Sequence, residues 1–124
     1  MQLDSPAVTL DLSVVGQLRE IARVSDPNLF QQLVDLYHHD CARYVATIQE
    51  SIKQADLTDA KRAAHALKSA SSNMGAMMVA ENCRLLEQNP ATTPNDEIIT
   101  LAKTIAEEYS SACKALQQLC EVSS

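Results

Sequence analysis

His65 is surrounded, at the spacing of helical turns, by basic and hydroxyl side chains: Lys61, Arg62, Lys68, Ser69 and Ser72. Three of the ten basic residues of the chain therefore lie around one histidine, although the net charge of the chain is −6. A neutral imidazole carries a nucleophilic lone pair near neutral pH, because its unperturbed pKa is about 6.5. An ammonium group can bind phosphate oxygens, and hydroxyl groups can donate hydrogen bonds to them. The pattern therefore predicts attack by His65 on a phosphoryl group that Lys68 stabilises, with the other four side chains around the phosphate and its carrier.

The angle of His65 on its helix supports this interpretation. Small and apolar residues recur along one helical face, which must be the core stripe: Ala60, Ala63, Leu67, Ala70 and Met74. His65 lies roughly 200° from Ala63 and from Leu67, so it points away from that stripe. Its neighbours Ala64 and Ala66 are small and leave the imidazole uncovered. On angles alone, a solvent-facing histidine among ordinary surface charges remains the alternative.

Composition limits the fold that can position these residues. The chain has 124 residues, of which 46% are hydrophobic, with two glycines and four prolines. That length indicates one domain. An all-β fold is excluded, because such folds need many turn residues and favour aromatic residues, and this chain has few of either. The acidic balance argues against binding to nucleic acid, which needs a basic surface.

The apolar spacing predicts an all-α fold. The expected helices are Leu12 to Val24, Asp26 to about Ala55, Asp56 or Thr58 to about Met74, Ala76 to about Gln88, and Thr93 to about Leu119. Proline at the first helical position would start the helices at Asp26-Pro27 and Thr93-Pro94, and Gly75 would end one in a left-handed conformation. Short connections make neighbouring helices antiparallel. We therefore expect an up-down antiparallel four-helix bundle with an additional short N-terminal capping helix.

The domain boundaries and the location follow from the same pattern. Residues 1–8 are predicted to form a flexible N-terminal tail, and residues 9–122 a single domain. No window reaches the roughly 18 apolar residues of a membrane span, and the N-terminus lacks the features of a signal peptide. We expect a cytoplasmic monomer without direct membrane insertion.

Two other groups of residues could have carried chemistry. Cys41, Cys83, Cys113 and Cys120 lack the spacing of metal ligands and are interpreted as small buried residues. His38 and His39 are adjacent, so they point about 100° apart on a helix and cannot easily bind one ion. We therefore expect no metal site. Met74, Met77 and Met78 lie at a helix junction and are interpreted as flexible apolar side chains that fill the core, whereas an exposed methionine there would instead belong to an adaptable binding patch.

Residues 64–76, AHALKSASSNMGA, resemble the signature of histidine-containing phosphotransfer (HPt) domains. That signature is His-x-Leu-Lys-Gly, then small residues, an apolar residue, Gly and often Ala. Leu85-Leu86-Glu87 resembles the Leu-Glu that often closes the next helix of the family, and the order of helices fits from about Leu12 to Leu119. Ser69 stands where the family usually has Gly, which keeps space for an incoming receiver domain.

The resemblance implies a phosphorelay intermediate without a kinase domain of its own. His65 would accept a phosphoryl group from a receiver-domain aspartate and pass it to another, as a stand-alone protein or as the C-terminal domain of a hybrid sensor kinase at the cytoplasmic side of the membrane. The receiver would supply Mg²⁺, so we expect no cofactor on this chain. A histidine kinase or another regulated protein is a further expected partner. The alternative function is a scaffold module that docks a partner on the same face without phosphotransfer.

The resemblance also implies a role for Glu87. Around the turn at Gly75, His65 and Glu87 would rise about 15 and 18 Å along antiparallel helices, which places them at one level. In related domains, a Glu or Gln at this position accepts a hydrogen bond from the histidine ring. Glu87 would then orient His65, unless it is simply a solvated residue. Tyr37 and Asp40 are candidates for the border of the docking face.

Overall fold

The structure is a computed structural model that describes residues 10–122, so the expected tail over residues 1–8 lies outside the described residues. It contains five helices and, within the described residues, no strand: α2 (Leu12–Ser25), α3 (Leu29–Lys53), α4 (Thr58–Asn73), α5 (Met77–Gln88) and α6 (Asp96–Val122). These correspond to the five helices that the spacing of apolar residues predicts.

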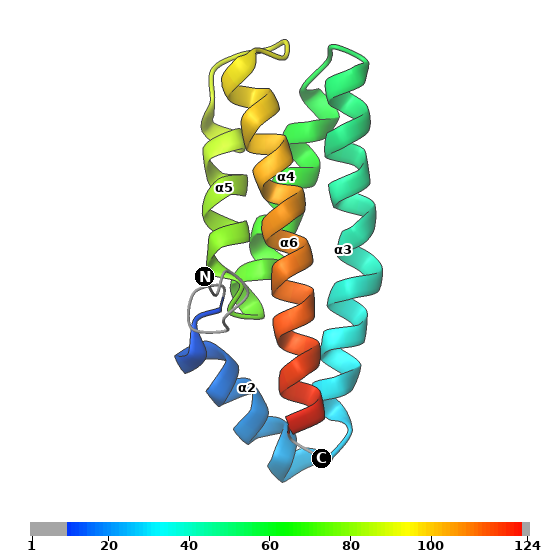
Figure 1. Cartoon of the computed structure of the whole chain (residues 1–124), viewed down its shortest axis with the longest axis vertical. Helices are drawn as coiled ribbons and strands as arrows, with labels where there is room; N and C mark the ends of the chain where they lie inside the picture. Colours follow the sequence, from blue (N-terminus) through cyan, green and yellow to red (C-terminus); the bar gives the residue numbers. More distant parts are fainter. Residues whose placement is uncertain (1–9, 123–124) are drawn as a thin grey trace.

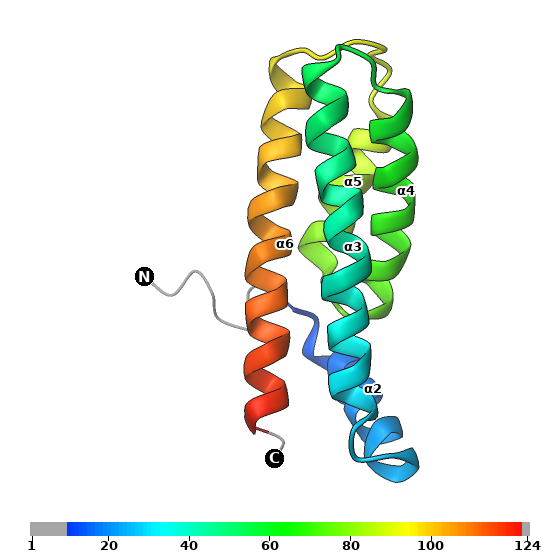
Figure 2. The same ribbon diagram turned by 90° about the vertical axis from the view of Figure 1, so that its right-hand side faces the viewer.

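Helices α3 to α6 form the antiparallel four-helix bundle (Figures 1 and 2). Each packs against its two neighbours, so α3 contacts α4 and α6, and α5 contacts α4 and α6. The shorter α4 and α5 line only part of the bundle's length, and α2 lies across the lower end that they leave open (Figure 1). The predicted fold class, including the capping helix, is therefore confirmed.

Two helices begin later than the prolines suggested. Pro27 and Pro94 precede the first turns of α3 and α6 instead of occupying them. Asp26 Oδ1 accepts a hydrogen bond from the Asn28 amide at 2.9 Å, within the turn before α3. Asn95 Oδ1 accepts from the Ile98 amide at 2.9 Å, which is the geometry of a helix N-cap. The predicted starts at Asp26-Pro27 and Thr93-Pro94 were wrong by about two residues, because Asp26 forms a turn ahead of α3 and Asn95, not Thr93, caps α6.

The core face of α4 is built mostly from small side chains. Ala60, Ala64 and Ser71 are buried, as are Leu67 and Met74, whereas Ala70 is only half-buried. The large buried side chains come mainly from the other elements: Ile48, Leu57, Leu86, Ile98, Ile105 and Leu116. Small side chains at a contact allow helices to approach closely, so α4 can pack tightly against both α3 and α5.

The cysteines take the structural role expected of them. Cys41 and Cys83 are buried, and Cys113 and Cys120 are partly buried. Burial raises the pKa of Cys41 to about 11 and that of Cys83 to about 12, so both stay protonated at neutral pH.

Neither a metal cluster nor a membrane span is found in the part of the chain that the structure describes. No group of three or more His, Cys, Asp and Glu side chains among residues 10–122 could hold a metal ion. No helix in this range combines the length and the apolar character needed to cross a membrane.

Gly75 joins three helices at one point. Its φ is +79°, the left-handed conformation predicted for the end of α4. Its carbonyl accepts a hydrogen bond from the Asp11 amide at 2.7 Å, which fastens the start of α2 to the α4–α5 turn. A Cβ atom at this position would lie 2.9 Å from Val15 Cγ2 and 3.0 Å from the Asp11 carbonyl oxygen. Only glycine fits here without a shift of α2.

We expect Gly75→Ala to lower the free energy of unfolding by about 1–3 kcal/mol, because alanine is strained at positive φ and its methyl group would press against α2. Gly16→Ala is the matched control, since a Cβ there meets nothing within 4 Å. In the interior of α2 that change should raise stability by up to ~1 kcal/mol. Urea unfolding of both variants measures the difference, and equal effects of the two would contradict this account of Gly75.

Candidate functional site

His65 and Glu87 meet across the face formed by α4 and α5. His65 lies in the middle of α4, and Glu87 lies in the last turn of α5. The turn at Gly75 makes the two helices antiparallel neighbours and brings the residues to one level. His65 Nδ1 and Glu87 Oε2 are 2.6 Å apart, and 63% of the histidine side chain is exposed. The contact expected between these two residues is present.

The second oxygen of Glu87 binds Lys68. Lys68 Nζ lies 2.7 Å from Glu87 Oε1, so one carboxylate holds the histidine with one oxygen and the ammonium group with the other. The side chains of Lys68 and Glu87 are 29% and 27% exposed, so water screens this pair only partly. The pKa of Glu87 is held below its ordinary value, chiefly by the Lys68 hydrogen bond and further by His65.

This arrangement sets the tautomer of the imidazole. An ionised carboxylate only accepts hydrogen bonds, so the ring nitrogen that faces it must carry the proton. Nδ1 is therefore the protonated nitrogen of the neutral ring, and Nε2 keeps its lone pair. A neutral His65 is thus prepared for nucleophilic attack through Nε2.

The remaining basic side chains have other contacts. Lys61 Nζ donates to the carbonyl oxygens of Asn89 and Ala91, at 2.5 and 2.8 Å, and so holds the start of the α5–α6 connection. Arg62 is exposed and lies 3.5 Å from Asp59 on its own helix. Lys61 is thus directed to the loop rather than to the imidazole. Arg62, in contrast, has an exposed guanidinium group that is available to a phosphate or a partner.

The two predicted hydroxyl groups lie on the exposed side of α4. Ser69 is exposed and Ser72 is half-buried. Arg84 lies one turn before Glu87 on α5. It is held by Glu81 and Gln88 of its own helix.

A shallow groove runs between α3 and α4 next to this site. Its lining comes from both helices: Leu33, Leu36, Tyr37, Asp40, Cys41, Tyr44, Ala66, Ala70, Asn73 and Met74. Ala66 directly follows His65, so the groove adjoins the exposed imidazole. Leu36 is 56% exposed, whereas Tyr37 is only 4% exposed. Both Tyr37 and Asp40 line the groove, and Leu36 supplies its exposed apolar side chain. A place for Tyr37 and Asp40 at the border of a docking face stays a prediction.

The methionines divide between core and surface. Met74 is buried, whereas Met77 and Met78 at the start of α5 are exposed. A binding role for the exposed pair stays a prediction.

An antiparallel helical bundle that holds an exposed histidine by its Nδ1 has the architecture of a phosphotransfer domain. Residues 32–122 match the family model of the Hpt domain, a range that includes His65, Lys68 and Glu87. The chain belongs to the Hpt domain family and is a phosphorelay intermediate. Domains of this family exchange phosphoryl groups with receiver domains and kinases.

Among solved structures, the chain is similar to the crystal structure of histidine-containing phosphotransfer protein B (HptB) from Pseudomonas aeruginosa PAO1. The TM-score is 0.75 and the sequence identity is 23%, and the alignment covers 93% of this chain and 96% of that chain. The likeness confirms the helical bundle. No curated protein sequence matches the chain significantly.

The lowered pKa of Glu87 should depend on Lys68. We expect Lys68→Met to raise this pKa toward its ordinary value, because the substitution removes the ammonium group and keeps an apolar stem. A carboxylate with a depressed pKa in the folded state contributes stability above its unfolded pKa of about 4.3. That contribution is lost as the pH falls through the depressed value, so the stability advantage of the wild type over Lys68→Met should disappear in acid.

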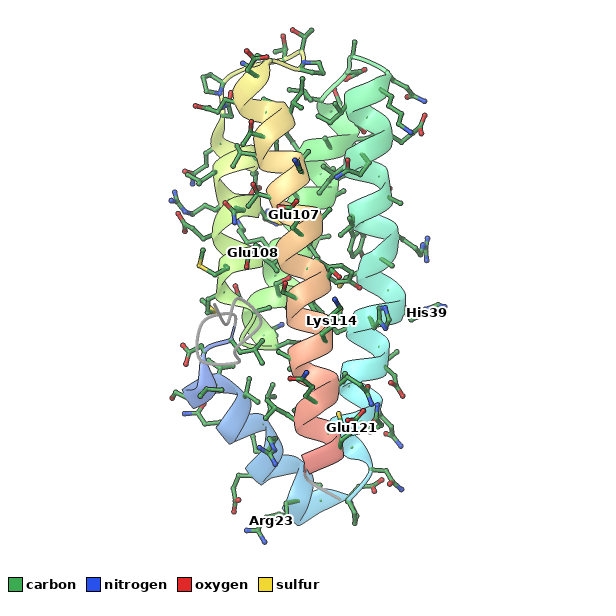
Figure 3. All side chains as sticks on the ribbon, in the orientation of Figure 1. Arg23, His39, Glu107, Glu108, Lys114 and Glu121 are labelled. Atoms are coloured by element: carbon green, nitrogen blue, oxygen red, sulfur yellow. The ribbon has the colours of Figure 1, made fainter. Side chains whose placement is uncertain are left out.

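Carboxyl carbon NMR titration measures the pKa, and urea unfolding at several pH values measures the stability. Lys114→Met is the control, because Lys114 projects from α6 and is exposed (Figure 3). A Glu87 pKa that stays the same in Lys68→Met would contradict the assigned cause.

Proposed function

We propose that His65 accepts a phosphoryl group on Nε2 from the aspartyl phosphate of a receiver domain. In this step the Nε2–P bond forms while the bond between phosphorus and the aspartate oxygen breaks, which releases a carboxylate. Transfer to the aspartate of another receiver reverses these events. The observation that carries the proposal is the 2.6 Å contact of Nδ1 with Glu87, which leaves the Nε2 lone pair for phosphorus.

The neighbouring side chains have distinct roles in this proposal. Phosphoryl transfer depends mainly on positioning and on stabilisation of charge. Glu87 orients the ring and balances the positive charge that the ring gains as Nε2 bonds to phosphorus. Lys68, one turn from His65, turns from Glu87 toward the phosphoryl oxygens. Arg62, Ser69 and Ser72 lie around the phosphate. The partner's receiver domain brings the Mg²⁺, and this chain holds no cofactor of its own.

The receiver domain docks over the groove between α3 and α4. This groove adjoins His65 through Ala66, and exposed Leu36 offers apolar area for burial. Ser69 is exposed on the turn after His65, where a small side chain lets the partner approach. The role of this domain is that of a relay intermediate rather than a kinase. It acts in the cytoplasm, alone or as part of a hybrid sensor kinase.

Replacement of His65 by glutamine should abolish phosphorylation. We expect no label on His65→Gln after incubation with a radiolabelled phosphorylated receiver domain, whereas the wild type gains an acid-labile, base-stable label. Because the side chain is mostly exposed, helix content and melting temperature should stay nearly unchanged. His38→Gln and His39→Gln are matched controls, since both histidines are exposed on α3, and both should accept label.

Label that persists on purified His65→Gln would overturn the assignment of the phosphoacceptor. A wild-type chain that binds the receiver but never gains label would instead support the scaffold function.

Replacement of Glu87 by alanine should slow transfer without abolishing it. We expect the rate to fall roughly ten- to hundredfold, the usual cost of losing a residue that orients a working histidine. Glu81→Ala is the matched control, because Glu81 lies on the same helix but pairs with Arg84. Rapid-quench kinetics with one phosphorylated receiver domain measure both variants. An unchanged rate in Glu87→Ala would make its contact with His65 incidental to the reaction.

A further inference from the structure

One buried polar connection links three helices of the bundle. The hydroxyl groups of Tyr37 on α3 and Ser71 on α4 are 2.7 Å apart, and both side chains are buried. The Tyr109 hydroxyl on α6 donates to the carbonyl oxygens of His38 and Tyr37, at 2.7 and 3.1 Å. Figure 2 shows α3 between α6 and α4. Tyr37 therefore ties α3 to α4, and Tyr109 ties α6 to α3.

The contact between α3 and α4 has particular need of such a tie. Helices find their register when large side chains of one fit into gaps on the other. The core face of α4 offers mostly alanines, with Leu67 and Met74 as its large buried side chains. A smooth surface of this kind specifies axial position weakly. A buried polar pair is known to fix register in packed helices, because every shifted arrangement leaves its polar atoms without partners.

We propose that Tyr37 is a positioning residue that fixes the register of α4 on α3 through Ser71, and so sets where His65 stands relative to the groove. This inference rests on the proposed function, in which a receiver domain docks over that groove. The groove takes its lining from α3 and from α4, whereas the nucleophile belongs to α4 alone. A slip by one residue would move His65 by about 1.5 Å along the axis and rotate it. A displacement of that size is enough to misalign a phosphoryl transfer.

The test compares two substitutions at the contact between Tyr37 and Ser71 with one substitution at Tyr109. Tyr37→Phe and Ser71→Ala each remove one partner of the hydrogen bond. Ser71 is fully buried, so a docking partner cannot touch it, and an effect of Ser71→Ala must pass through the helix contact. Tyr109→Phe is the matched control, because it removes a buried tyrosine hydroxyl that ties α3 to α6 instead of α4.

We expect Tyr37→Phe and Ser71→Ala to lower kcat for transfer from a phosphorylated receiver domain roughly three- to tenfold, the factor that one hydrogen bond is worth. KM should change less than kcat, because the substitutions remove no apolar side chain from the groove, whereas the transfer step depends on where His65 stands. Labelling of His65 by phosphoramidate should stay at the wild-type rate, since a small donor needs no docking surface. The double variant should be no slower than the single variants, because all three lack the same contact. Tyr109→Phe should lose stability and keep its kcat.

An independent arm needs no partner. Amide chemical shifts of Tyr37→Phe should change along α4, whereas those of Tyr109→Phe should change where α3 meets α6. A wild-type kcat in Tyr37→Phe would overturn the inference, as would an equal loss of kcat in Tyr109→Phe or a parallel loss of phosphoramidate labelling. Failure of the proposed function differs from all of these, because the wild type itself would then gain no label from the receiver. In that case the amide chemical shifts alone test whether Tyr37 fixes the register of α4 on α3.

Discussion

The site depends on one carboxylate that accepts hydrogen bonds from two side chains at once. Glu87 reaches His65 with one oxygen and Lys68 with the other, and it must stay ionised to do both. The pKa of Glu87 is lowered by those same partners, so the three side chains hold one another in their working states. Because the carboxylate sits on α5 and both partners sit on α4, the arrangement exists only while these two helices stay level.

The turn between α4 and α5 sets the relative axial position of these two helices. Gly75 adopts a conformation that costs other residues strain, and it ends α4 where α5 can begin almost at once. The same glycine accepts a hydrogen bond from α2, so the capping helix braces the turn from outside. The axial position of α4 relative to α3 is specified less strongly, because the core face of α4 is mostly alanine. The hydrogen bond between Tyr37 and Ser71 supplies the directional contact there.

The sequence predicted the helices well and the contacts of long side chains poorly. Apolar spacing located all five helices, because burial of one face dominates helix placement in a small bundle. Helix starts were less certain, since Asn95 competed with Thr93 as a cap. Helical rise placed His65 and Glu87 at one level, and the resemblance to HPt domains supplied the expectation of a hydrogen bond between them. Lys61 was predicted to lie around the phosphate, but its ammonium group binds the Asn89 and Ala91 carbonyls. A lysine at helical spacing reaches several acceptors, and these two come from a connection without periodicity. The spacing of apolar residues does not separate Leu36 from Tyr37 as the core residue of its turn, whereas the packing buries Tyr37 and leaves Leu36 exposed.

The loop contact of Lys61 has a consequence for a histidine that it does not touch. Its ammonium group sits at the carboxyl end of α5, where the helix dipole favours a cation and where terminal carbonyl groups lack partners. Asn89 lies only two residues after Glu87, so this lysine keeps the last turn of α5 from fraying. A neutral residue at position 61 would remove these two hydrogen bonds and so weaken the hold on the turn that carries Glu87. Lys61 therefore helps to hold Glu87 in place beside His65, although it does not itself reach the phosphate.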